Sequence, residues 1–449
     1  MATTPPTLDF HRVKPMVVAV DMGYGHLRAA RPLARALATD LVHVDQPPLV
    51  GAEERRVWER VRGFYEWTSR ISQVPALGRP FRWLLDSLTD IPRLHPYRDL
   101  SRPTQGVVAL DRLIRRRQLG KGLVERLRET QDPLLTTFYS PAIAADRAGL
   151  NNVFCVVTDS DINRVWAPLQ PERTSIRYLV PSARAVRRLR TYGVPGHRIA
   201  FTGFPLPHEL VGGPRLGALR RNLAARLVRL DTTREFRRWY REELDQFLGP
   251  LPAEEEGRPP LLSFAVGGAG AQVHFARHFL PSFRPAIREG RLRLALIAGV
   301  RREVAEAFRA YVAEAGLDDS LGKGLEILEA ASLEEYFTRF DELMARTDIL
   351  WTKPSELTFY AALGLPIVFA PPVGVHERYN RRFARESGAG LAQRDVSFAA
   401  QWIADWLEDG TLAGIAWSGF MRLPKHGLYR ILDEVGAGEA SELGRTAAV

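Results

Sequence analysis

The stretch that decides the fold is VKPMVVAVDMGYGHLRAARPLARALATDLVHV, residues 13–44. It begins with a short, almost uninterrupted apolar run, Val13–Val20, which predicts a buried strand. A glycine-containing loop follows, and apolar residues then recur at helical spacing from His26 to about Thr39. Leu41–Val44 is apolar again and predicts a second strand. Strand, glycine loop, helix and strand in this order are the start of a doubly wound parallel sheet.

Strands and helices alternate on both sides of a central interruption. In the first half we expect further strands at 134–138, 152–158, 175–180 and 199–201, with helices near 107–130, 141–148 and 183–192. The alternation then stops at a charged helical stretch, 213–250, and at an acidic, proline-flanked segment, 252–260. In the second half it restarts, with strands at 261–266, 292–297, 325–328, 349–351 and 366–369.

This pattern predicts an α/β protein of two Rossmann-like domains, since 449 residues are too many for one compact core. The N-terminal domain would span 12–212 and include an aromatic- and arginine-rich helical insert, 52–104. A helical linker segment, 213–258, would lead to the C-terminal domain, 259–410, and helices would follow at 411–449.

The composition indicates the cellular location and the kinds of partner to expect. The formal net charge is +10, which either an anionic partner or a general preference for arginine would produce, and we expect no nucleic-acid partner. A single cysteine, Cys155, excludes an intrachain disulfide and a cysteine-cluster metal site and indicates a cytoplasmic protein. Met1–Phe10 lacks the apolar core of a signal peptide, and no apolar run is long enough to span a bilayer. Any membrane contact is therefore expected to be peripheral, at the inner face.

The first candidate site is the loop Gly23, Tyr24 and Gly25, with His26 at the start of the following helix. Glycines after a strand allow a ligand to approach the backbone closely, and the helix start offers unpaired N–H groups. An imidazole in this position can reach into a cleft. A glycine turn with a capping histidine is the structural alternative.

A second candidate site follows the predicted strand 152–158. Asp159 and Asp161 come at the carboxyl edge of the sheet, where open α/β sheets bind ligands. Two carboxylates there would orient a base or sugar hydroxyls. A helix-capping aspartate with a solvated neighbour is the structural alternative.

A glycine loop also follows the first strand of the second half, with Gly267, Gly268, Gly270 and Gln272. It lacks the Lys-Ser/Thr pair of a P-loop, which disfavours a site that cleaves a triphosphate. Small residues suit a diphosphate held on backbone N–H groups.

Several polar residues between 352 and 380 strengthen the interpretation that this half binds a diphosphate. Lys353 would offset phosphate charge, while His376, Glu377 and Asn380 follow a strand end and are placed to bind sugar hydroxyls. Two glycine loops in separate halves, together with this run, indicate a nucleotide-sugar site more strongly than either loop alone.

These motifs resemble those of the inverting GT-B glycosyltransferases. The most similar branch is that of the monogalactosyl- and diglucosyl-diacylglycerol synthases, with the peptidoglycan N-acetylglucosaminyl transferase as a relative. The loop Gly23–His26 resembles the Gly-Gly-Gly-His loop of that branch. The family's donor signature, Thr-Lys-Pro-Gly-Gly-x-Thr, Leu-Pro and Pro-Gly-Gln-Glu-x-x-Asn, is similar to Thr352–Thr358, Leu365-Pro366 and Gly374–Asn380. Further matches are Val157–Asp159 with Trp166, Pro181-Ser182, Gly193–Pro195 and Thr202–Pro205.

The resemblance implies a GT-B architecture, with two doubly wound domains facing a cleft and with helices at 411–449 that return to the first domain. It also implies transfer of a sugar to a lipid or glycan acceptor. It implies His26 as the catalytic base, with Asp159 as its partner or an alternative base, and no metal. The nucleotide-diphosphate sugar would be a co-substrate, with no further cofactor. The donor-binding candidates are Gly267, Gly268, Gly270, Gln272, Gly299, Lys353, Pro354, Ser355, Thr358, His376, Glu377 and Asn380.

The sequence departs from the family pattern at three places. Ser355-Glu356 replaces the glycine pair, and a carboxylate there would repel a diphosphate. Ala361 stands where the family has an acidic residue that holds the ribose, and His376 replaces a glutamine. A nucleotide-sugar epimerase of the same fold and a non-catalytic relative that binds a ligand or partner therefore remain alternative functions.

The insert 52–104 suggests a route for an apolar acceptor. Six of its aromatics, Trp58, Phe64, Tyr65, Trp67, Phe81 and Trp83, lie among many arginines, including Arg55, Arg56, Arg60, Arg62, Arg70, Arg79 and Arg82. Apolar faces with basic flanks suit peripheral contact with an anionic membrane. The alternative is that the aromatics form the core of an irregular helical subdomain.

Overall fold

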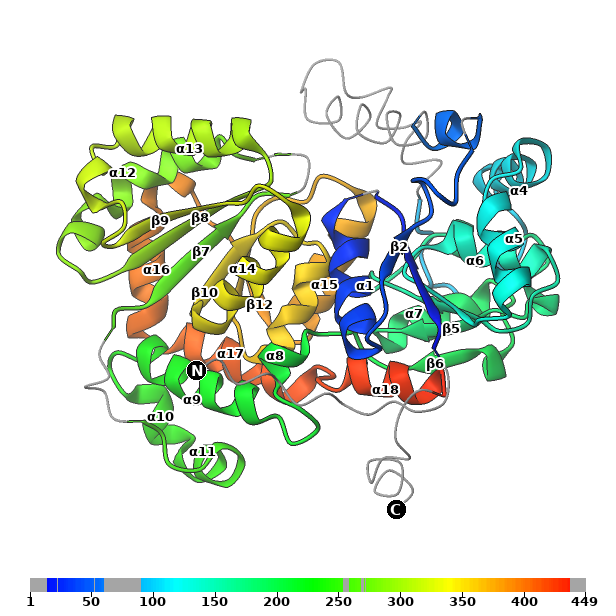
Figure 1. Cartoon of the computed structure of the whole chain (residues 1–449). Helices are drawn as coiled ribbons and strands as arrows, with labels where there is room; N and C mark the ends of the chain where they lie inside the picture. Colours follow the sequence, from blue (N-terminus) through cyan, green and yellow to red (C-terminus); the bar gives the residue numbers. More distant parts are fainter. Residues whose placement is uncertain are drawn as a thin grey trace. The chain divides into compact units, whose positions relative to one another are not determined.

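The computed structural model describes residues 14–21, 23–51, 53–59, 90–252, 258–267, 270 and 272–436. The chain divides into two compact units: the first comprises Met1–His208 and His426–Val449, and the second comprises Glu209–Lys425. Within the described residues, each unit contains one parallel sheet of six strands with helices around it (Figure 1).

The sheet of the first unit has the strand order β2-β1-β3-β4-β5-β6, and all neighbouring strands are parallel. The strands are β1 (Met16–Ala19), β2 (Leu41–His43), β3 (Leu134–Thr136), β4 (Val153–Val156), β5 (Arg177–Val180) and β6 (Ile199–Phe201). The longer helices are α1 (Tyr24–Ala36), α4 (Gln105–Arg117), α5 (Lys121–Thr130), α6 (Tyr139–Arg147), α7 (Ala183–Thr191) and α18 (Gly427–Glu434).

The central strands are apolar because the sheet is covered on both faces. Val17 on β1 aligns with Leu41 on one side and with Leu135 on the other. Both Val17 and Leu135 are fully buried. The strand–loop–helix–strand start predicted from residues 13–44 is therefore confirmed.

The single helix predicted near 107–130 is wrong, because the chain forms α4 and α5 with a break between them. Gln118 and Gly120 both adopt left-handed backbone conformations, with φ of 52° and 84°. The buried carboxylate of Glu54 accepts a hydrogen bond of 2.6 Å from the Gly120 N–H. This contact satisfies a backbone donor where α5 begins, which a continuous helix would not expose.

Residues 53–59 are helical, and they contain one of the aromatics of the predicted membrane-contacting insert. Trp58 is only 4% exposed and packs in the core of the first unit. Its indole N–H donates to Glu54 at 3.3 Å. Trp58 is therefore a core residue, as the alternative interpretation of the insert expected, while Phe64, Tyr65, Trp67, Phe81 and Trp83 lie outside the described residues.

The sheet of the second unit has the strand order β12-β11-β10-β7-β8-β9, again parallel throughout. The strands are β7 (Leu261–Ala265), β8 (Arg293–Gly299), β9 (Leu325–Glu329), β10 (Ile349–Thr352), β11 (Ile367–Phe369) and β12 (Gly390–Ala392). The helices include α9 (Gly217–Leu230), α10 (Glu235–Trp239), α11 (Arg241–Leu248), α12 (Phe275–Arg288), α13 (Arg302–Glu314), α14 (Leu333–Arg346), α15 (Val375–Glu386), α16 (Ala399–Glu408) and α17 (Thr411–Arg422). Residues Glu356–Leu363 form a 3-10 helix, η6.

Helix α9 is fixed to the amino ends of the strands of this second sheet. Arg226 is buried and donates to the carbonyls of Thr347, Leu363 and Gly364, which precede β10 and β11. Its burial lowers the pKa of Arg226 to about 10. The buried carboxylate of Asp348 pairs with Arg229, one turn further along α9. These contacts place the helical stretch that follows α9 near the amino edge of the sheet.

The chain returns to the first unit at His426. Glu434 of α18 pairs there with Arg177 of β5 at 2.7 Å, and the Tyr429 hydroxyl lies 2.9 Å from Nδ1 of His208. In the described part of the chain, no helix combines the length and apolar character needed to cross a membrane.

Candidate functional site

Both sheets reverse their winding direction between two central strands. In the first unit the reversal lies between β1 and β3, and in the second it lies between β7 and β10. Open α/β sheets bind ligands at the carboxyl ends of such strand pairs, because the following loops diverge to opposite faces and leave a crevice. The loops after these four strands are therefore the candidate sites, and they contain most of the residues singled out from the sequence.

The loop after β1 leads directly into α1. Gly23 precedes the helix with φ 114° and ψ 165°, a conformation that a residue with a side chain rarely adopts. Tyr24 and Gly25 are the first two helical residues, and His26 is the third. The N–H groups of this first turn have no intrahelical partner and add a partial positive charge that favours an anion or a developing oxyanion.

The ring of His26 is oriented by the loop after β3. Its Nδ1 lies 2.8 Å from the carbonyl oxygen of Thr137 and 3.3 Å from the hydroxyl of Thr158. A carbonyl oxygen can only accept, so Nδ1 carries the proton and the basic lone pair lies on Nε2. The Thr137 hydroxyl donates to the backbone carbonyl of His26 at 3.0 Å, which fixes the helix start against the same loop.

Aromatic rings surround this imidazole. Phe138 meets the His26 ring edge-on at 4.7 Å between centroids, and Trp166 lies at 6.5 Å. Tyr139 stacks on Phe138 and lies 5.3 Å from Trp166. These rings restrict the imidazole to one orientation and give its surroundings an apolar character.

The two aspartates after β4 have different roles. Asp159 is half-buried and remains a candidate at the sheet edge. Asp161 is fully buried and forms a bidentate pair with the equally buried Arg188 of α7, at 2.7 and 2.9 Å. It also accepts from the Ile162 N–H at 3.0 Å. The expectation that both carboxylates orient a ligand is therefore corrected, because Asp161 holds α7 to the loop.

Replacing Asp161 with asparagine is expected to lower the free energy of unfolding of the first unit by about 3–5 kcal/mol, because it leaves Arg188 buried without its counter-charge. Denaturant unfolding followed by fluorescence measures the change. The matched control is Asp159→Asn, which is expected to stay within about 0.5 kcal/mol of the wild type. Equal stability of both variants would show that the buried pair is not needed for folding.

In the second unit, the loop after β7 forms a tight turn. The Gly270 N–H donates to the carbonyl of Gly267 at 2.7 Å. Gln272 adopts a left-handed conformation, with φ 76°, and its side-chain amide donates to the Pro371 carbonyl after β11 at 2.7 Å. Gly299 ends β8, at an irregularity in its pairing with β9. Gly268 lies outside the described residues.

One ion pair joins the loop after β10 to helix α15. The ammonium of Lys353 lies 2.6 Å from Oε1 of Glu377 on α15, and Oε2 of Glu377 accepts from the Val373 N–H at 2.7 Å. Burial would raise the pKa of Glu377, but the charges of Lys353 and His376 and these hydrogen bonds hold its pKa below the ordinary value. Glu377 is only 2% exposed, so its charge depends on Lys353.

The Lys353 side chain also lies against the glycine loop. A β-carbon at Gly267 would come within 2.3 Å of Cε and 3.1 Å of Nζ of Lys353. The loops after β7, β10 and β11 therefore meet around one ammonium group, at the winding reversal of the sheet.

The other donor candidates lie around this centre. The side-chain amide of Asn380 donates to the Pro354 carbonyl at 3.4 Å, and the Ser355 hydroxyl accepts from the Leu357 N–H. The imidazole of His376 folds back towards Gly374. Thr358 is fully buried, and its hydroxyl has no hydrogen-bond partner among the described residues. In that same part of the chain, no group of three or more His, Cys, Asp and Glu side chains could hold a metal ion.

The structure shows the surroundings of two residues at which the sequence differs from the family pattern. Ala361 is buried under α17, where a β-carbon on Gly419 would come within 2.4 Å of the Ala361 carbonyl oxygen. Glu356 is 9% exposed and begins η6. An acidic side chain at position 361 would have to displace α17.

Sequence reasoning missed the residues that orient His26 and Glu377. Thr137 and Val373 contribute groups that no motif distinguishes, whereas Thr158 lies within the Val157–Asp159 match, although its contact with His26 was not predicted. For Thr137 the only available signal was position, since it lies near the end of a predicted strand of the sheet that also positions His26.

A family model described as a domain of unknown function (DUF6938) matches residues 317–430. No curated protein matches the chain. Among solved structures, S. aureus MnaA in its co-structure with UDP has a TM-score of 0.50 at 11% identity, covering 94% of this chain and 96% of that chain. A glycosyltransferase from Rickettsia africae has a TM-score of 0.43 at 10% identity, covering 94% and 98%. The UDP-GlcNAc 2-epimerase from Methanocaldococcus jannaschii, in complex with UDP-GlcNAc and UDP, has a TM-score of 0.40 at 13% identity, covering 93% and 98%.

The likeness to the S. aureus structure extends over nearly the whole of both chains and shows the fold. The protein is an α/β protein of the GT-B type, built from two doubly wound parallel-sheet units. The fold class expected from the sequence is thereby confirmed.

Proposed function

We propose that the protein is an inverting, metal-independent glycosyltransferase that moves a sugar from a nucleotide-diphosphate donor to a lipid or glycan acceptor. The observation that carries this proposal is the orientation of His26. Its Nδ1–H bond to the Thr137 carbonyl leaves the basic lone pair on Nε2, at the winding reversal of the first sheet. An imidazole held in this tautomer can take the proton of an acceptor hydroxyl.

The proposed reaction is a single displacement. As its proton passes to Nε2 of His26, the acceptor oxygen bonds to the anomeric carbon of the donor sugar. The bond from that carbon to the diphosphate breaks on the opposite face, and its electron pair leaves with the nucleoside diphosphate. Asp159, at the end of β4, is the partner of His26 or the alternative base.

The leaving diphosphate gains negative charge, which the second unit is equipped to stabilise. Lys353 supplies an ammonium beside the Gly267 turn. Helix α15, which begins at Val375, points the positive end of its dipole to the same loops. His376, Glu377 and Asn380 on α15 are the proposed contacts to the sugar hydroxyls.

The test is a thermal-shift screen of the whole chain against nucleoside diphosphates and nucleotide sugars. A ligand at about one hundred times its Kd stabilises the folded state by about 2.7 kcal/mol, which is readily seen as a rise in Tm. Nucleotides that stabilise the protein are then incubated with lipid and glycan acceptors, and released nucleotide is measured.

The outcomes distinguish three functions. Nucleotide release with a glycosylated acceptor supports the transferase. A free epimeric sugar, formed without an acceptor, would instead identify an epimerase, the activity named for the M. jannaschii protein. Binding without turnover would identify a non-catalytic relative. If no nucleotide raises Tm, the proposed donor site is contradicted.

A further inference from the structure

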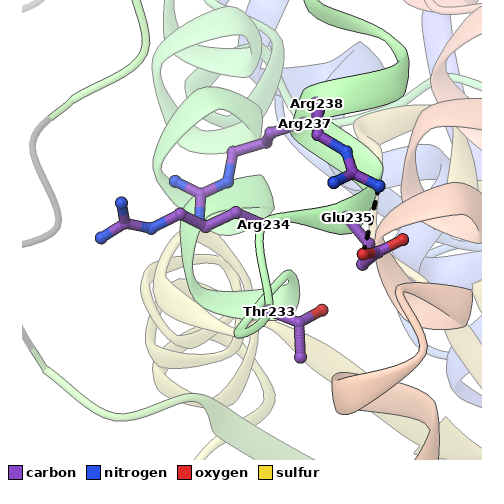
Figure 2. Close-up of a pocket in the computed structure, with 5 residues that line it drawn as sticks. All are labelled: Thr233, Arg234, Glu235, Arg237 and Arg238. Carbon is purple, nitrogen blue, oxygen red and sulfur yellow. Dashed lines mark hydrogen bonds and ion pairs between the residues drawn. The ribbon is translucent and has the colours of Figure 1, made fainter.

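A solvent-exposed pocket of about 350 Å³ lies in the second unit, apart from the candidate donor loops. Its lining residues belong to one short segment and are Thr233, Arg234, Glu235, Arg237 and Arg238 (Figure 2). The segment follows α9, whose Arg226 and Arg229 are fixed at the amino ends of the strands. The donor candidates follow the carboxyl ends, so the pocket is a separate feature of the unit.

The segment is held by a buried carboxylate. Asp231 is fully buried, and its Oδ2 accepts from the backbone N–H of Arg237 at 2.9 Å and from its Nε at 3.0 Å. Oδ1 accepts from the Phe236 N–H at 3.1 Å. The hydroxyl of Thr233 donates to the Glu408 carbonyl at 2.7 Å, which ties the rim to the end of α16. The guanidinium of Arg237 is therefore positioned by its ion pair with Asp231.

Arg234 occupies a conformation that favours glycine. Its φ is 63° and its ψ is 12°, in the left-handed region, directly before α10. A non-glycine residue there is strained, and strain of this kind often accompanies a functional position.

The pocket keeps a net positive charge, although the buried carboxylate of Asp231 pairs with Arg237. Its lining residues carry three guanidinium groups and one carboxylate. That carboxylate, Glu235, pairs with Arg238 at 3.4 Å, and both side chains remain exposed (Figure 2). The Arg238 guanidinium also lies 5.4 Å from the ring centroid of Trp239, which is 71% exposed.

We infer that this pocket binds a phosphate ester. The exposed Arg234 and Arg238 on its rim suit an anion with several oxygens, because a planar guanidinium fork can donate two hydrogen bonds. The volume leaves room for an organic group beside the phosphate, and the exposed ring of Trp239 offers an apolar face to it. The phosphate would come either from a soluble metabolite or from the headgroup of an anionic lipid.

The test uses the whole chain and two probes. Glycerol 3-phosphate, titrated by calorimetry, represents a soluble ester, and co-sedimentation with phosphatidylglycerol vesicles represents the headgroup, with phosphatidylcholine vesicles as blank. The variant R234Q/R238Q is expected to lose at least about tenfold in affinity for the probe that the wild type binds. The control R288Q/R291Q removes two exposed arginines outside the pocket, each of which lies beside a carboxylate. Its affinity for the same probe is expected to stay within about twofold of the wild-type affinity.

Binding of glycerol 3-phosphate supports a soluble ligand, and binding only to phosphatidylglycerol vesicles supports a lipid headgroup. The variant Arg234→Gly separates binding from folding, because it removes a guanidinium while relaxing the backbone. It is expected to bind more weakly with an unchanged or higher Tm. Failure of both probes to bind the wild type, or unchanged affinity in R234Q/R238Q, would overturn the inference.

Discussion

Replacing His26 with alanine is expected to lower turnover by about 10²–10⁴-fold, while affinity for the nucleotide donor stays nearly unchanged. The imidazole lies at the winding reversal of the first sheet, whereas the donor candidates belong to the second unit. Loss of the ring therefore removes the proposed proton acceptor without removing a donor contact. Steady-state kinetics with the donor found by thermal shift, together with a separate binding titration, measure the two effects.

The matched control for this experiment is His197→Ala, which removes an exposed histidine from the same unit. It is expected to turn over at the wild-type rate. A second variant, His26→Gln, keeps a polar side chain at the position but lacks a comparable base, and it is expected to be as slow as the alanine variant. If His26→Ala retained the wild-type rate, the residue would only cap α1, and Asp159 would become the candidate base.

The sheet architecture could be predicted because each strand is locally encoded. Runs such as Val13–Val20 and 261–266 are apolar on both faces, which is the pattern of a covered parallel strand. The polar residues at their ends then fall on one edge of the sheet by geometry alone. His26 and Lys353 were found in this way, before any contact was known.

The contacts that define the candidate sites could not be predicted in the same way. Glu377 is 24 residues from Lys353, and Thr137 is 111 residues from His26, so each pair depends on how the strands are ordered in space. The strand-end pattern alone did not separate Asp159 from Asp161, although the family resemblance pointed to Asp159. The structural role of Asp161 depends on its buried contact with Arg188 of α7, a contact between residues 27 apart in the chain.

Helix interruptions were the other source of error. The break between α4 and α5 depends on left-handed residues at Gln118 and Gly120 and on the distant carboxylate of Glu54. A glutamine is not a typical helix stop, and apolar spacing continues across the break. Local propensity therefore favours one continuous helix, whereas the tertiary hydrogen bond to Glu54 stabilises two separate helices.

Replacing Gly267 with alanine is expected to lower affinity for the nucleotide donor by about 10- to 100-fold, since losing a charge-assisted contact costs about 1.5–3 kcal/mol. The added methyl group would lie 2.3 Å from Cε and 3.1 Å from Nζ of Lys353, so the lysine side chain has to move. Its ammonium would then leave the position beside Glu377 that the proposed diphosphate site requires. Because the buried Glu377 depends on Lys353 for its counter-charge, Tm is also expected to fall, and donor affinity is compared at a temperature at which the variant is folded.

A double-mutant cycle makes this prediction specific. In a Lys353→Met background the ammonium is already absent, so adding Gly267→Ala is expected to lower donor affinity much less than it does alone. Gly217→Ala serves as the control, because a β-carbon there meets its nearest neighbours at 3.5 and 3.6 Å, which is ordinary contact. If Gly267→Ala bound the donor as tightly as the wild type, or if its effect were fully additive with that of Lys353→Met, the diphosphate would not be held between the β7 turn and Lys353.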